Sequence, residues 1–209
     1  MPQTERRPLQ DATLADQFHA VRSLTEALAA PLSEGDACLQ SMEDASPAKW
    51  HLAHTTWFWE TFLLREAVAG YRPYRQEWPF LFNSYYEAEG ARLPRTLRGM
   101  LSRPSLAEVL EWRAHVTEAM APLLADPAQS ERTAPLVSLG IAHEQQHIEL
   151  LLTDIKHALW QNPLGPAMFP ASVSPRVGGG LGHLQNDTVR GSRLRGNARG
   201  DAGWHIHPG

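Results

Sequence analysis

The sequence predicts an all-α protein, a four-helix bundle followed by a tail without regular structure. Four long segments carry apolar residues at helical spacing, no segment before residue 165 alternates as a strand would, and from residue 171 the periodic pattern stops. A chain of 209 residues is long enough for one well-filled core. We therefore divide it into a helical domain, residues 12–168, and a tail, residues 169–209, which we expect to be disordered.

The first helix is predicted to run from Leu14 to about Ala30. Its apolar residues recur every three or four positions: Leu14, Phe18, Val21, Leu24 and Leu28. That spacing places them on one helical face. Pro31 and the polar run after it are expected to end the helix.

The second helix has a predicted start and a predicted stop. Ser46 is suited to cap its first turn, and Pro47 stands where a helix tolerates proline. The helix is expected to continue to about Ala69, and Gly70 is a natural end.

The connection that follows, residues 71–104, is unusually long. It holds four prolines and several aromatic residues, so we expect it to pack down, partly as short helix. Connections of this length in compact domains are usually functional.

The third and fourth helices complete the bundle. Ser105 and Glu108 form a capping-box pattern at the start of the third, and Pro127 lies beyond its end. The fourth is expected to begin near residues 133–135 and to end by Pro163. Bundles of this kind build metal sites from side chains on facing helices.

The tail is rich in glycine and arginine and cannot bury enough apolar surface to order itself. It ends with His205 and His207, which we interpret as solvated side chains rather than as metal ligands.

Composition excludes several classes of function. The net charge is −4 with no basic block, so nucleic acid is not an expected partner. No apolar run approaches the roughly 20 residues of a membrane span, and the N-terminus lacks a signal peptide. The single cysteine, Cys38, excludes an internal disulfide and fits a reducing compartment, so the predicted localisation is cytoplasmic. We expect Cys38 to be a buried or half-buried apolar residue.

His143 and His147 are the strongest chemical feature of the chain. Two histidines four apart on a helix point the same way, which suits a transition metal. Leu139, Leu150, Leu151 and Ile155 surround the pair, and from them we predict that its face turns inward.

A zinc peptidase is one interpretation of this motif, with Glu144 as general base. It requires a third ligand downstream, but no Asp or Glu follows Asp154 until Asp187, and the metzincin positions hold Leu150 and Thr153. We therefore expect Glu144 either to support a metal ligand from outside the coordination sphere or to lie on the surface.

The third ligand is better sought on the second helix. His54 is flanked at helical distance by Trp50, Trp57 and Phe58, so we expect it on the buried face. His51 is expected nearer the edge. The unpaired histidines His19, His115 and His157 are expected to have structural roles.

Three stretches carry a family resemblance: residues 46–60 (SPAKWHLAHTTWFWE), residues 143–158 (HEQQHIELLLTDIKHA) and residues 81–86 (LFNSYY). They resemble the N-terminal DinB-like domain of the sulfoxide synthases of ergothioneine biosynthesis. The resemblance covers roughly residues 12–168, and the two histidine blocks are specific.

The resemblance implies a DinB-like bundle with a mononuclear non-haem iron(II) site held by His54, His143 and His147. Family members use O₂ to couple a cysteine-type thiol, γ-glutamylcysteine or cysteine, to the imidazole carbon of hercynine, forming a sulfoxide. Arginines between the second and third helices hold the carboxylates of the thiol. Here these correspond to Arg95 and Arg98.

The chain also departs from the family. Its enzymes continue into a C-terminal domain of the sulfatase-modifying-factor type, which supplies most of the hercynine pocket. The tail does not resemble the start of that domain, so we expect the activity to be incomplete in this chain. A truncated or frameshifted reading frame would explain such an ending.

Two alternatives stay open. DinB-like bundles include thiol-dependent transferases that use zinc or a similar divalent ion. A non-catalytic metal-binding or interaction domain is the other, with an apolar surface around residues 78–86 that once met the missing domain.

Overall fold

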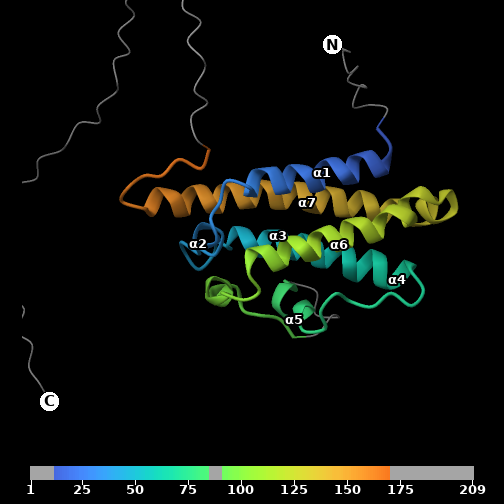
Figure 1. The fold of residues 1–209 in the computed structure, drawn as a ribbon, viewed down its shortest axis with the longest axis horizontal. Coiled ribbons are helices and arrows are strands. Elements are labelled where there is room, and N and C mark those ends of the chain that lie inside the picture. The colour runs from blue at the N-terminus through green and yellow to red at the C-terminus, as the bar shows by residue number, and fades with distance from the viewer. Residues whose placement is uncertain (1–11, 85–90, 170–209) are drawn as a thin grey trace, which may run out of the picture. The chain divides into compact units, whose positions relative to one another are not determined.

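The computed structural model describes residues 12–84 and 91–169. Four long helical segments form the bundle shown in Figure 1: α1 (Leu14–Ala29), α3 (Ala48–Phe58), α6 (Leu106–Ala125) and α7 (Pro127–Gln161). A π-helical segment (Trp59–Leu64) and α4 (Arg65–Ala67) prolong α3. The described residues contain no strand, which confirms the predicted all-α class.

Within the described residues, three short helices lie between the long ones. Two of them, α5 (Trp78–Phe82) and a 3₁₀ helix (Arg95–Met100), belong to the long connection, which packs down partly as short helix, as predicted. The third, α2 (Glu34–Ala37), was not predicted. Its cap residue Ser33 exchanges hydrogen bonds with Asp36, so the polar run that ends α1 starts another turn of helix.

Most helix ends agree with the sequence, and two differ. The Ser105–Glu108 capping box opens α6 as predicted. The fourth helix begins earlier than expected, at Pro127, because Asp126 caps it by accepting from two backbone N–H groups. Ser46 does not cap α3. Its hydroxyl instead accepts a hydrogen bond from Arg98.

The helix α3 occupies the centre of the bundle. It packs against α1, α6 and α7, and α5 adds a further contact. All its residues are buried. A side chain on the inner face of α3 therefore lies deep in the molecule, and α7 packs directly against α3.

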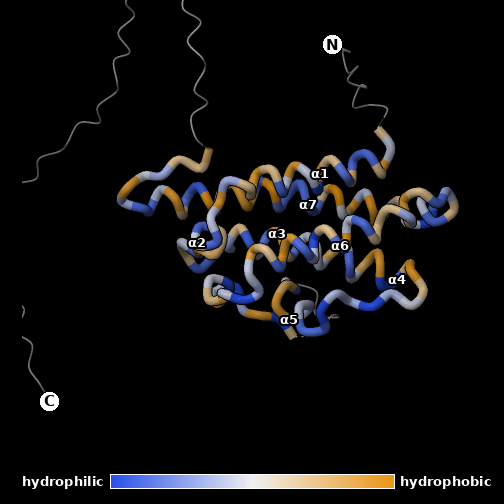
Figure 2. Tube along the Cα trace, viewed as in Figure 1, coloured by the Kyte–Doolittle hydropathy of each residue, from blue (hydrophilic) through white to orange (hydrophobic). Residues whose placement is uncertain are grey.

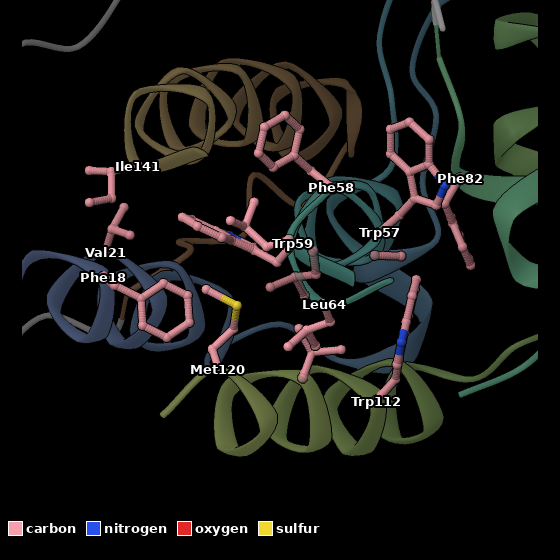
Figure 3. Close-up of a cluster of buried hydrophobic side chains, with 14 of the residues drawn as sticks. Phe18, Val21, Trp57, Phe58, Trp59, Leu64, Phe82, Trp112, Met120 and Ile141 are labelled. Carbon is pink, nitrogen blue, oxygen red and sulfur yellow. The ribbon is translucent and has the colours of Figure 1, made fainter. Parts of the chain in front are cut away.

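Aromatic side chains fill the core. Figure 3 shows them between α1, α3, α6 and α7, and the largest fully buried ones include Trp57, Trp59 and Trp112. Figure 2 shows hydrophobic and hydrophilic residues interspersed along the long helices. Burial of such large apolar surfaces stabilises the fold by roughly 25 cal/mol per Å².

A glycine allows α7 to approach the α3 segment closely. A Cβ built on Gly140 would lie 2.5 Å from Cη2 of Trp59 and 2.9 Å from Cε1 of Phe58. No side chain larger than hydrogen fits there without displacing these rings.

Cys38 is half-buried, within the range predicted for it. The predicted tail lies, apart from residue 169, outside the described residues. None of the helices in the described part combines the length and the apolar character needed to cross a membrane.

Candidate metal centre

Three imidazoles converge where α3 faces α7. His54 comes from α3, and His143 and His147 come from successive turns of α7. One nitrogen of each lies within 4.8 Å of one nitrogen of each of the others. Among residues 12–84 and 91–169, these three histidines are the one group of His, Cys, Asp or Glu side chains placed closely enough to hold an ion.

His54 is held by hydrogen bonding and by stacking. Its Nδ1 lies 2.6 Å from the carbonyl oxygen of Phe82. Because a carbonyl only accepts, Nδ1 carries the proton and Nε2 keeps its lone pair. The ring stacks on Trp50 at 4.5 Å and on Trp57 at 5.4 Å between centroids. Burial, reinforced by His143, lowers the pKa of His54 well below its usual range.

His143 has a nitrogen that is available as a ligand. Its Nδ1 is buried and has no hydrogen-bond partner among the described residues. Burial lowers the pKa of His143 to about 4, although the neighbouring Glu144 charge opposes the shift. A buried ring nitrogen without a partner is costly unless an ion or a water satisfies it.

His147 is oriented by a fourth histidine. Its Nδ1 lies 2.9 Å from Nδ1 of His51, whose Nε2 lies 3.0 Å from Oδ2 of Asp154. Burial lowers the pKa of His147, and the nearby His54 and His51 lower it further. This contact corrects the sequence-based placement of His51, which is 2% exposed rather than at the edge. Since α3 is buried on every side, its sequence has no polar face from which to assign an edge.

The donor set fits a divalent transition metal. Metal binding needs neutral imidazoles, and the lowered pKa values keep all three rings neutral near pH 7. Imidazole suits iron, zinc, copper and nickel, and three protein ligands leave positions for other groups. The arrangement can therefore hold an ion that also binds a substrate atom.

A cavity of about 420 Å³ opens from the three histidines. Charged and polar groups from three segments line it, namely Asp44, Ser46, Ser84, Arg95, Arg98, Gln146 and Asp154. Leu150 also lines it and is 41% exposed, and Leu139 is 56% exposed. The prediction that these two leucines share an inward face was wrong: Leu150 faces the cavity, and Leu139 is exposed away from it. Leu151 and Ile155 are buried as expected.

The two arginines singled out in the sequence line the same cavity. Arg98 is 5% exposed, lies 3.4 Å from the centroid of the Trp50 ring, and donates to the hydroxyls of Ser46 and Ser84. Arg95 is nearer the solvent and donates to the backbone carbonyl of Asp44. The structure thus brings both guanidinium groups to the cavity that contains the histidines.

Glu144 lies on another side of α7 from the histidines. It is fully buried and accepts hydrogen bonds from Arg22, Thr25, Trp59 and Arg113. Although burial opposes ionisation, the two arginines lower its pKa to about 2. The expectation that Glu144 supports a ligand or lies on the surface is therefore corrected: Glu144 joins α7 to α1, α6 and the π-helical segment, and it hydrogen-bonds none of the three site histidines.

The remaining histidines of the described part stay outside the site. His19 packs against Phe18, and His115 against Tyr71 and Tyr74. His157 lies 2.7 Å from the Ser41 hydroxyl. Local contacts of this kind agree with the structural roles expected for them.

Comparison with known proteins assigns the family. No curated protein matches the chain. Residues 17–151, well over half of the sequence, match the DinB superfamily, and the matched region contains all three site histidines. The chain therefore belongs to the DinB superfamily.

Proposed function

We propose that the chain provides the iron(II) site of an ergothioneine-forming sulfoxide synthase. In that reaction a cysteine-type thiol, γ-glutamylcysteine or cysteine, is joined to the imidazole carbon of hercynine with O₂ as oxidant. The observation that carries the proposal is the three-histidine group, which lines the same cavity as two arginines.

The reaction balances with these components alone. One C–H bond and one S–H bond break, one C–S bond forms, one oxygen atom of O₂ enters the sulfoxide, and the other leaves as water with the two hydrogens. Iron(II) on three imidazoles would supply the dioxygen chemistry, since such sites leave open positions. The residues of this chain would hold the iron and position the substrates.

Arg98 and Arg95 are proposed to bind the carboxylates of the thiol substrate. A guanidinium matches a carboxylate in a two-point contact, which a lysine cannot reproduce. Arg98 is already oriented by Trp50 and two hydroxyls, so little side-chain freedom is lost when a carboxylate binds. A thiol anchored at its carboxylate end can then extend toward the histidines within the same cavity.

The test is a single-turnover reaction. The chain is loaded with iron(II) without oxygen, mixed with hercynine and γ-glutamylcysteine or cysteine, and then exposed to O₂. We expect oxygen uptake and a sulfoxide product detectable by mass spectrometry. His54→Ala, loaded in the same way, should give neither.

Two results would change the proposal. Sulfoxide from a longer relative with a second domain, but none from this chain, would restrict the function to iron binding. Zinc retained after purification without added metal, with no oxygen uptake, would instead support a thiol-dependent transferase.

A further inference from the structure

We propose that Asp154 and His51 are positioning residues that set the tautomer of His147 and thereby direct its Nε2 lone pair into the metal site. The inference rests on the proposed metal site but concerns residues that do not themselves touch the ion. It follows from hydrogen-bond geometry that is present in the protein alone.

Asp154 begins a series of hydrogen bonds that leads through His51 to His147. Its Oδ2 accepts from the backbone N–H of Ser46 at 2.8 Å and lies 3.0 Å from Nε2 of His51. The Asp154 side chain is 13% exposed and that of His51 3%. Both side chains are therefore largely buried, although they line the cavity.

The proton positions follow from the carboxylate. A carboxylate accepts hydrogen bonds, so His51 carries its proton on Nε2 and its Nδ1 becomes an acceptor. His147 Nδ1, 2.9 Å away, must then donate, which leaves Nε2 of His147 as the nitrogen with the lone pair. The opposite tautomer of His147 would place two lone pairs against each other at that distance.

The positions of His51 on α3 and Asp154 on α7 explain why these residues orient His147. His51 precedes His54 by almost one turn of α3, and Asp154 follows His147 by two turns of α7. The contact therefore spans the same two helices as the ligands. Hydrogen-bond partners that orient a metal-binding histidine typically change metal affinity by 10–100-fold when they are removed.

The first experiment needs no variant and no metal. Long-range ¹H–¹⁵N correlation spectra of the metal-free protein, labelled at histidine, distinguish an Nδ1–H from an Nε2–H imidazole. We expect His147 as the Nδ1–H tautomer and His51 as the Nε2–H tautomer. An Nε2–H tautomer of His147 would overturn the proposal whatever the protein catalyses.

The second experiment separates hydrogen bonding from charge. Asp154→Leu removes the acceptor at similar size, whereas Asp154→Asn keeps an acceptor oxygen and removes the charge. Cobalt(II) titrations followed by visible absorption should show affinity about 10–100-fold weaker for Asp154→Leu. Asp154→Asn should recover most of that loss, and the tautomer of His147 should be mixed only in Asp154→Leu.

Asp44→Asn is the matched control, because Asp44 lines the same cavity but hydrogen-bonds no histidine among the described residues. It should leave the tautomer of His147 unchanged. Equal loss of cobalt affinity in Asp154→Asn and Asp154→Leu would mean that the carboxylate acts by charge alone, against the proposal. None of these readouts depends on sulfoxide formation, so failure here and failure of the proposed function are distinguishable.

Discussion

Arg98 combines three contacts that hold one side chain in one position. Its guanidinium lies over the Trp50 ring, and its two terminal nitrogens donate to hydroxyls on either side, Ser46 and Ser84. The Trp50 ring in turn stacks on the candidate ligand His54. The position of the Arg98 guanidinium is thus tied to the position of a candidate metal ligand through one aromatic ring.

Replacing Arg98 with lysine should weaken binding of the proposed thiol substrate. An ammonium lacks the planar fork that contacts a carboxylate at two points and stacks on an indole. We expect the Kd for γ-glutamylcysteine to rise about 10–100-fold, since a charge-assisted hydrogen bond contributes roughly 1.5–3 kcal/mol. Anaerobic calorimetric titration of the metal-loaded protein measures it.

The same exchange at Arg132 is the control. Arg132 is exposed on α7 and bonds Gln129, away from the cavity. Its variant should bind the thiol like the parent. An unchanged Kd in Arg98→Lys would remove Arg98 from the proposed carboxylate site.

At the scale of elements, α7 carries two separate polar sites on one helix. One side presents His143 and His147 to α3, and another presents Glu144 to Arg22 of α1 and Arg113 of α6. Both arginines are fully buried. The second site fixes the rotation of α7 and so holds the histidines toward α3.

Glu144→Gln should destabilise the fold strongly. The amide removes the countercharge that Arg22 and Arg113 share, and Arg113 keeps only the half-exposed Glu26; breaking a buried ion pair in this way costs about 3–5 kcal/mol. Urea unfolding at pH 7 measures the loss. Glu149→Gln, the same change at an exposed position of α7, should stay within about 0.5 kcal/mol.

The Glu144 contribution should also depend on pH. Its pKa is about 2 in the folded protein, below the ordinary 4.5. The stabilisation is therefore complete above about pH 4.5 and is lost as the pH falls toward 2. Unfolding free energies measured from pH 7 to pH 2.5 should show the parent and Glu144→Gln converging below pH 4.5. A constant difference across that range would contradict the assignment.

Gly140→Ala should destabilise the packing of α7 against the α3 segment. The added methyl group would meet the rings of Trp59 and Phe58, and overpacking typically costs about 1–3 kcal/mol. The higher helix propensity of alanine offsets up to about 1 kcal/mol. Gly35→Ala in α2 is the control, because its Cβ would meet only the Ser33 hydroxyl at 3.7 Å. A thermal unfolding series that ranks the two variants equally would contradict the tight-contact interpretation.

Sequence patterns predicted the helices with distinct apolar faces well, but they assigned the cap of α3 to Ser46 and missed the Asp126 cap that starts α7. The start of α6 followed from Ser105 and Glu108, and the two candidate ligands of α7 followed from their spacing of four. Patterns failed where burial is uniform or where partners are distant in sequence. His51 lies on a helix buried all round, and Glu144 meets arginines on two other helices. No local signal encodes such contacts.

For the whole molecule, an ion at the three histidines would link helices that are distant along the chain. His54 on α3 and His143 on α7 are separated by the long connection, α5 and α6. An ion held by both helices binds the folded state and not the unfolded chain. Metal binding and folding stability are then coupled.

Adding iron(II) without oxygen, or cobalt(II) in air, should raise the melting temperature of the chain. At a free metal concentration 100 times Kd the expected stabilisation is about 2.7 kcal/mol. That corresponds to roughly 5–10 °C for a domain of this size. Thermal unfolding followed by circular dichroism measures the shift, and a chelator should reverse it. His54→Ala and His147→Ala should abolish the shift, whereas His19→Ala, at an exposed histidine outside the site, should keep it. An equal shift in all three variants would assign the metal effect to adventitious surface binding.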